Sequence, residues 1–244
     1  MMYNNFMNDD FISTVSHELR TPLTSIKGFS ETILNSWDKL DDESKKKFLK
    51  IIIEQSNRLI NLVENMLSVS KLQETKGDLI YKEFSIKPVI DMTCSVIKNQ
   101  YSDKTFEVII DEKTPPILAD KDKFQQIMTN LIENAAKYGD LNTKITIKSC
   151  YDNEFVSIKV INTGIEINEE DYEKIFTKFS RIDNPLTRKV QGSGLGLYIT
   201  KNLVEKMGGN ISVTSKEHLT TFEVKLPVSN IERQAKNAVS HADN

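Results

Sequence analysis

Residues 11–31, FISTVSHELRTPLTSIKGFSE, determine the architecture of the first part of the chain. Apolar residues recur there at alternating steps of three and four, which is the spacing of a heptad seam along an α-helix. The pattern predicts a long amphipathic helix with one apolar face. Its seam consists of Ile12, Val15, Leu19, Pro22, Ile26, Phe29 and Ile33.

A second helix is predicted after a polar break at residues 37–47, WDKLDDESKKK, where Asp41 or Asp42 can act as the helix cap. Two antiparallel helices cannot enclose a core as wide as these faces, so we expect a homodimer that forms a four-helix bundle. A plain coiled-coil stalk explains the seams equally well. The second seam is Phe48, Ile52, Gln55, Leu59, Leu62, Met66 and Val69, widened by Ile51, Val63 and Leu67.

The periodicity changes after residues 73–78, QETKGD. Short β-rich runs then alternate with helical patterns, which predicts a mixed sheet covered by helices on one face, an α/β sandwich. The expected domains are a helical domain at 1–75, a linker at 76–80, an α/β domain at 81–228 and a tail at 229–244. The β-rich runs are 105–110, 144–151, 155–162, 210–215 and 221–227, and the helical patterns are 87–100, 121–138 and 195–207.

Composition excludes several classes of protein. A formal net charge of -3 over 244 residues provides no basic field for sequence-independent capture of nucleic acid. The two cysteines, Cys94 and Cys150, lie far apart in the sequence without metal-ligand spacing, which fits a reducing cytoplasm. No apolar run approaches the roughly 18 residues of a membrane span, and no signal sequence or sensor domain precedes residue 7. We therefore expect a cytoplasmic chain, either complete or a fragment of a longer, membrane-associated protein.

His17 is the first candidate functional residue. It lies two positions after Val15 and two before Leu19, so its imidazole is turned away from the seam and toward water. Glu18 follows directly, with a carboxylate able to hold the imidazole proton and leave the other ring nitrogen nucleophilic. Pro22 invites a kink close to this site. A solvated surface pair explains His17 and Glu18 equally well.

A second set of candidates lies on the helix predicted at 121–138. Asn130, Asn134 and Lys137 share one face at positions i, i+4 and i+7. Amide oxygens are suitable ligands for Mg²⁺, and a lysine supplies positive charge for phosphate oxygens. A polar helix face without a ligand is the alternative explanation.

The segment GSGLGLYI, residues 192–199, places Gly192, Gly194 and Gly196 directly before a predicted helix. Such a loop can bring backbone N–H groups and a helix N-terminus against phosphates, although sharp turns also require glycine.

Taken together, these motifs resemble those of sensor histidine kinases of two-component systems. Residues 11–31 are similar to the phosphoacceptor box of that family. The asparagine helix, VINTG at 160–164, KIFTKFSRID at 174–183 and the glycine loop follow in the order of the boxes of its ATP-binding domain. That domain has the Bergerat-type fold of the gyrase, heat-shock-90 and mismatch-repair ATPases. The resemblance extends from Met7 to Pro227.

The resemblance implies roles for individual residues. His17 is the phosphoacceptor, Glu18 its acid/base partner, and Thr21 a residue that positions water for dephosphorylation of a regulator. Asn130 stands where hydrolysing relatives carry a glutamate, which favours phosphoryl transfer. Residues 166–191 form a lid anchored by Phe176 and Phe179, with Arg188 and Lys189 as either γ-phosphate contacts or solvated charges. Asn134 is assigned to Mg²⁺, Lys137 to phosphate, Tyr138, Asn162 and Gly164 to adenine, and Gly192, Ser193, Gly194, Leu195, Gly196 and Leu197 to the phosphate loop.

The adenine box departs from the family pattern Asp-x-Gly-x-Gly at two positions, Asn162 and Glu166. Asn162 retains an acceptor oxygen but lacks a carboxylate charge, which we expect to cost roughly 1 kcal/mol, or about fivefold to tenfold in affinity. Glu166 replaces a hinge glycine with a residue that resists positive φ.

The expected function is ATP- and Mg²⁺-dependent phosphorylation of His17 and transfer to an aspartate of a response-regulator receiver domain, with phosphatase activity toward the regulator as an additional role. A catalytically weak homologue that acts as a dimeric regulatory module is the alternative. A conformational machine that hydrolyses ATP is disfavoured by Asn130.

Overall fold

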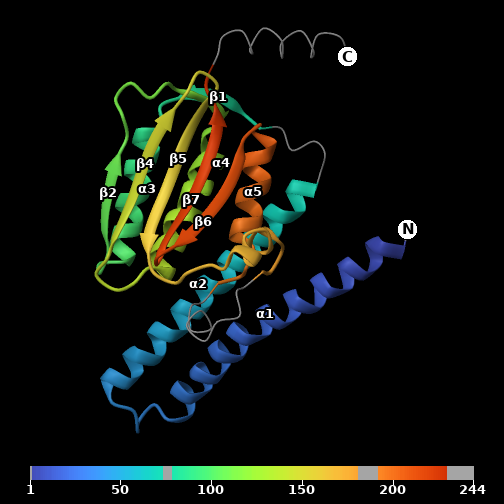
Figure 1. The fold of residues 1–244 in the computed structure, drawn as a ribbon. Helices are drawn as coiled ribbons and strands as arrows, with labels where there is room; N and C mark the ends of the chain where they lie inside the picture. The colour runs from blue at the N-terminus through green and yellow to red at the C-terminus, as the bar shows by residue number, and fades with distance from the viewer. Residues whose placement is uncertain (1, 74–78, 181–191, 230–244) are drawn as a thin grey trace. The chain divides into compact units, whose positions relative to one another are not determined.

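The chain folds into two compact units, residues 1–73 and 74–244. The structure, a computed structural model, describes residues 2–73, 79–180 and 192–229, with side chains from residue 13 to residue 72 in the first range. The first unit is a helical hairpin and the second an α/β domain (Figure 1). The predicted fold class is therefore confirmed. In the described part of the chain, no helix combines the length and apolar character needed to cross a membrane.

The hairpin consists of α1 (Met2–Asn35) and α2 (Asp42–Gln73). Asp41 caps α2, because its Oδ1 accepts a hydrogen bond from the backbone N–H of Ser44 at 2.7 Å. The two seams meet between the helices. The rings of Phe29 and Phe48 lie 5.2 Å apart, and Leu62 is buried. Pro22 is also buried and lies within the continuous helix α1.

A second apolar stripe on α2 faces solvent. Ile53, Ile60 and Leu67 follow one another at heptad spacing and are 59%, 54% and 56% exposed. Val63, which the sequence places on the widened face, is also exposed. A single hairpin therefore leaves an apolar helix face uncovered.

The α/β domain contains a five-stranded sheet with the order β2-β4-β5-β7-β6. β2 and β4 are parallel and the other neighbours are antiparallel. The β6 side chains alternate between buried and exposed, so the sheet has one apolar face and one polar face. The strands are β2 (Thr105–Ile109), β4 (Lys144–Tyr151), β5 (Phe155–Thr163), β6 (Asn210–Lys216) and β7 (Leu219–Pro227).

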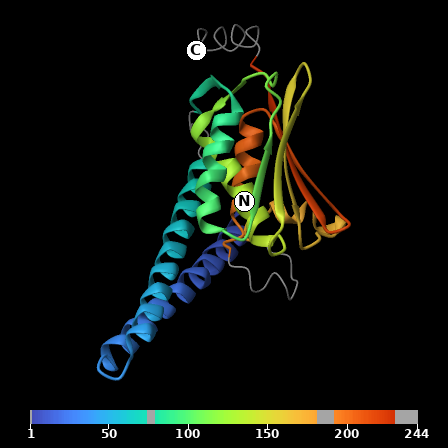
Figure 2. The same cartoon turned by 90° about the vertical axis from the view of Figure 1, so that its left-hand side faces the viewer.

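Three helices cover the apolar face of this sheet, α3 (Ile86–Gln100), α4 (Lys121–Tyr138) and α5 (Gly196–Lys206). Figure 2 shows the helices on one side of the sheet and the other side open. α4 lies between α3 and α5 and contacts β5. Its buried stripe includes Phe124, Ile127 and Leu131.

A separate two-stranded sheet was not predicted. β1 (Tyr81–Phe84) and β3 (Ile117–Asp120) pair antiparallel, and the ring of Phe84 lies 5.5 Å from that of Phe124. Two short 3₁₀ helices, η1 (Glu169–Asp171) and η2 (Lys174–Phe176), follow β5.

Several predicted segments lie outside the described residues. They are residues 74–78, which include the first three residues of the linker predicted at 76–80, the later part of the predicted lid, residues 181–191 with Arg188 and Lys189, and the tail from residue 230.

Candidate functional site

His17 is exposed on α1, as its position off the seam predicted. Its neighbour Glu18 is turned toward α2, where Glu18 Oε2 lies 3.2 Å from Arg58 Nη2. The side chains of both partners in this ion pair are 23% exposed. Thr21 is exposed and its hydroxyl donates to the carbonyl oxygen of His17 at 3.3 Å. In this conformation, Glu18 is held by Arg58.

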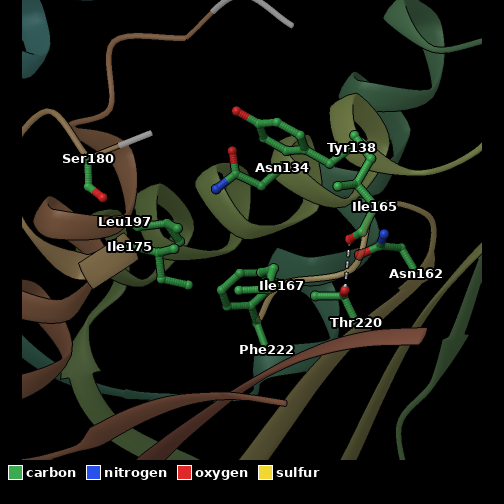
Figure 3. Close-up of a pocket in the computed structure, with 10 residues that line it drawn as sticks. All are labelled: Asn134, Tyr138, Asn162, Ile165, Ile167, Ile175, Ser180, Leu197, Thr220 and Phe222. Atoms are coloured by element: carbon green, nitrogen blue, oxygen red, sulfur yellow. Dashed lines mark hydrogen bonds between the residues drawn. The ribbon is translucent and has the colours of Figure 1, made fainter. Parts of the chain in front are cut away.

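The second unit contains a pocket between α4, the end of β5, the segment that follows β5, α5 and β7. Figure 3 shows its lining residues, with Asn134 and Tyr138 projecting from α4. The walls are largely aliphatic and aromatic, which suits a flat heterocycle. The lining residues are Asn134, Tyr138, Asn162, Ile165, Ile167, Ile175, Ser180, Leu197, Thr220 and Phe222.

Asn162 lies near the end of β5, where its register partner on β7 is Thr220. The side chain is only 3% exposed. Thr220 Oγ1 donates to the carbonyl oxygen of Ile165 at 3.3 Å and lies 2.7 Å from Ser215 Oγ. Ser215 Oγ in turn accepts from the backbone N–H of Ile167 at 3.0 Å. These bonds fix the segment after β5 against the sheet beneath the pocket.

Gly164 is required by a close approach of two backbones. A Cβ at this position would collide with the carbonyl oxygen of Tyr138, and Gly164 forms a β-bridge with Gly139. The N–H of Ile165 donates to that same carbonyl at 3.2 Å. Gly164 therefore lets the segment after β5 run directly against the end of α4.

The expectation that Glu166 occupies a position requiring positive φ is wrong. Among the described residues other than glycine, positive φ occurs at Asn142, Phe179, Glu217 and His218. Glu166 is an exposed residue outside the pocket lining. The backbone turn after Gly164 uses ordinary negative φ there, so a glutamate is tolerated without strain.

The three polar residues predicted to converge on α4 have different surroundings. Asn134 lines the pocket. Asn130 instead joins α4 to α5, because its Nδ2 donates to the carbonyl oxygen of Gly196 and to the hydroxyl of Thr200, both at 3.3 Å. Lys137 Nζ lies 2.9 Å from Glu133 Oε2. The described pocket thus contains Asn134 alone of these three.

Lys137 is firmly cationic. Burial lowers its pKa, but the charge and hydrogen bond of Glu133 outweigh that effect, so the net pKa is raised. The ammonium is half-buried and supplies a fixed positive charge one turn beyond Asn134.

The glycine loop leads into α5. Gly194 has φ of +66°, and a Cβ there would lie 2.7 Å from the backbone carbon of Phe179, which has φ of +58°. Ser193 Oγ accepts from the N–H of Leu195 at 3.3 Å, and Leu195 is fully buried. Of the loop residues Gly192, Ser193, Gly194, Leu195, Gly196 and Leu197, Leu197 lines the pocket.

Phe176 is buried and meets Phe222 edge to face, with ring centroids 6.4 Å apart. Together with Ile175, which is also buried, it fixes the first half of the lid predicted at 166–191 to the core. Sequence reasoning missed six lining residues, Ile165, Ile167, Ile175, Ser180, Thr220 and Phe222. Their apolar or hydroxyl side chains carry no distinctive pattern. The pairing of β7 with β5 brings Thr220 and Phe222 to the site, and the other four lie in the segment that follows β5.

Within residues 2–73, 79–180 and 192–229, no three His, Cys, Asp or Glu side chains gather as a metal-binding group. A cation near the pocket would therefore rely on the Asn134 amide and on oxygens of its ligand.

Two family models match the chain. Residues 7–75 match the His Kinase A (phospho-acceptor) domain, and residues 119–230 match the histidine kinase-, DNA gyrase B- and HSP90-like ATPase domain. Sensor protein SrrB of Staphylococcus aureus is 36% identical over 225 residues, which are 91% of this chain and 38% of SrrB. The histidine-protein kinase ArlS of Staphylococcus haemolyticus is 33% identical over 215 residues, 88% of this chain and 47% of ArlS. The chain spans less than half the length of these relatives.

Solved structures have the same fold. Histidine kinase ThkA, solved in complex with response regulator protein TrrA, superimposes with a TM-score of 0.74 at 28% identity, over 93% of this chain and 64% of that one. Histidine kinase AdeS of Acinetobacter baumannii gives a TM-score of 0.70 at 24% identity, over 88% and 98%, and supports the fold alone. With a phospho-acceptor domain followed by an ATPase domain, the chain belongs to the family of sensor histidine kinases.

Proposed function

We propose that this chain is the catalytic core of an ATP-dependent protein-histidine kinase that phosphorylates His17 and passes the phosphoryl group to an aspartate of a response-regulator receiver domain. The observation that carries the proposal is the combination of an exposed histidine on a helical hairpin with a buried, largely apolar pocket that contains the amide of Asn162. The use of ATP places the reaction in the cytoplasm.

The pocket residues bind the nucleotide in this proposal. The base enters between the aliphatic walls and meets Asn162, while Tyr138 borders it from α4. Lys137 and the backbone N–H groups of the loop before α5 attract the phosphates. Asn134 would hold Mg²⁺ through its amide oxygen, and the ion would supply positive charge that neutralises the phosphates.

In the chemical step, an imidazole nitrogen of His17 attacks the γ-phosphorus. The bond from the γ-phosphorus to the bridging oxygen breaks, ADP leaves, and Glu18 accepts the imidazole proton after it releases Arg58. The second step transfers the phosphoryl group from His17 to a carboxylate oxygen of the regulator. ThkA, which is 28% identical, was solved with a response regulator, which supports a receiver domain as the partner here. Thr21 lies one turn from His17. It positions water for a separate reaction, dephosphorylation of the regulator.

The experiment incubates the wild-type chain and His17→Ala with magnesium and γ-labelled ATP. We expect acid-labile label on the wild type and none on His17→Ala. Thr24→Ala, an exposed substitution two turns from His17, is the matched control and should be labelled like the wild type.

A second candidate is a dimeric regulatory module with little kinase activity. The neutral amide of Asn162 favours this candidate, because an amide binds the adenine amino group more weakly than a charged carboxylate does. A folded wild-type chain that stays unlabelled at saturating ATP would contradict the kinase proposal and support this module.

A further inference from the structure

Asn162 has an open hydrogen-bonding amide in the wall of the pocket. The residue is 3% exposed, and none of the side-chain hydrogen bonds found among the described residues involves its Oδ1 or Nδ2. The residues around it in the pocket include Ile165, Ile167 and Phe222. Its amide atoms are not among the fully buried polar atoms without a partner, of which the described residues contain Ser229 Oγ alone, so they face the pocket and are available to a ligand that enters it.

The other buried polar residue of the lining is already engaged. Thr220 Oγ1 bonds to the carbonyl oxygen of Ile165 at 3.3 Å (Figure 3). It also bonds to Ser215 Oγ at 2.7 Å. The Ser215 oxygen accepts the N–H of Ile167, so its own proton is available for Thr220. The edge of a bound base therefore forms its hydrogen bonds mainly with the Asn162 amide.

An amide presents one donor and one acceptor side by side. The 6-amino group of adenine donates to Oδ1 while ring nitrogen N1 accepts from Nδ2. A 6-oxopurine has the opposite pattern, because its N1 carries a proton and O6 accepts. When the amide turns by half a rotation about its last bond, Oδ1 and Nδ2 exchange places and make two bonds to that base as well. A carboxylate has acceptors alone and repels O6.

We propose that Asn162 makes this pocket tolerant of the group at purine C6, so that the chain uses inosine triphosphate as a phosphoryl donor alongside ATP. The inference rests on the proposed function, in which the pocket binds a nucleoside triphosphate. Inosine triphosphate differs from ATP only at C6 and N1, so it isolates the contribution of this contact.

The test measures dissociation constants of ATP and inosine triphosphate, each with magnesium, by titration calorimetry on the full chain and on Asn162→Asp. For the wild type, we expect the two constants to agree within about fivefold, since both bases make two bonds to the amide. In Asn162→Asp, the dissociation constant of inosine triphosphate should rise about tenfold or more relative to that of ATP, because the carboxylate faces O6 and repels it. Asn210→Asp makes the same chemical change at an exposed residue outside the pocket and should keep the wild-type ratio.

The outcomes separate the two proposals. If the wild type binds ATP and labels His17 but binds inosine triphosphate more than about tenfold more weakly, the tolerance is wrong and the kinase proposal stands. If the ratio of the two dissociation constants is the same in the wild type and in a folded Asn162→Asp, Asn162 is not the cause of the tolerance. If neither nucleotide binds the wild type, both proposals fail. The wild-type ratio needs no variant, so a misfolded Asn162→Asp does not leave the question open.

Discussion

His17 and Glu18 are neighbours in the chain, yet their side chains leave α1 in different directions, since successive helical residues are rotated by about 100°. His17 points to solvent and Glu18 meets Arg58. A Glu18 carboxylate that turns to the imidazole gives up this ion pair. Ion pairs between partly exposed side chains contribute only about 0.2–1 kcal/mol to stability, so breaking this pair requires little free energy compared with a catalytic barrier.

The two thiols should differ sharply in reactivity. Burial, with a smaller contribution from Asp91, raises the pKa of Cys94 from 9.0 to about 11. Cys150 is exposed. Since the thiolate is the reactive form, Cys94 stays protonated and shielded at pH 8, and its reactivity rises only as the pH approaches its raised pKa.

We therefore expect iodoacetamide at pH 8 to modify the native chain once, at Cys150, as mass spectrometry of the digest would report. Cys150→Ser should prevent modification of the native chain, and urea should restore it through Cys94. Modification of Cys94 in the native chain at a rate equal to Cys150 would contradict this account.

At the scale of single residues, sequence reasoning placed Asn134, Tyr138, Asn162 and Leu197 in one site, and all four line the pocket. The resemblance of their motifs to the boxes of the family's ATP-binding domain made that possible. Glu166 was misjudged because sequence does not give φ at a turn. The aliphatic lining was invisible because such residues occur throughout any core.

At the scale of elements, α4 is joined to the start of the α/β domain through Asp120. Asp120 is the N-cap of α4 and accepts the backbone N–H groups of Asp122 and Lys123 at 3.0 and 3.1 Å. It also accepts the N–H of Ile80 at 3.0 Å, directly before β1. One buried carboxylate thus holds both the first strand and the helix that carries Asn134.

Asp120→Ala should lower the free energy of unfolding of the α/β domain by about 1–2 kcal/mol, since it removes the cap and leaves three donors without this acceptor. Asp120→Asn keeps an acceptor oxygen and should retain most of the stability. Urea unfolding followed by circular dichroism gives the measurement, with exposed Asp122→Ala as the control. Equal losses in Asp120→Ala and Asp120→Asn would show that the cap oxygen is not what matters.

Elements with a clear period were predicted well. The β-rich runs predicted the bounds of β4 and β6 to within one residue, and the helical pattern at 121–138 predicted α4. β1 and β3 were missed because four-residue strands are too short to display a period, and their pairing depends on distant parts of the chain.

At the scale of the whole molecule, the uncovered stripe of Ile53, Ile60 and Leu67 favours self-association. Burial of an apolar side chain contributes about 1.5–3 kcal/mol, and a symmetric pair of hairpins buries two such stripes, one from each chain. A four-helix bundle is the arrangement that such faces satisfy.

Ile60→Glu places a charge in the middle of this stripe and should convert the dimer to a monomer at micromolar concentration. Sedimentation equilibrium would measure the mass. Asn61→Glu adds the same charge at an exposed polar position of α2, about two turns beyond Glu54 on the same face, and should remain dimeric. A wild-type chain that sediments as a monomer would contradict the bundle.

β5 lies at the centre of the sheet, and its pairing with β7 joins Thr163 to Leu219, so η1, η2, α5 and β6 all lie in the intervening chain. Contacts of such long sequence separation slow folding, because the entropy of closing the intervening chain is lost before the contacts form. The hairpin of α1 and α2 needs only a short turn. During refolding, the helices that carry His17 should therefore assemble before the pocket exists.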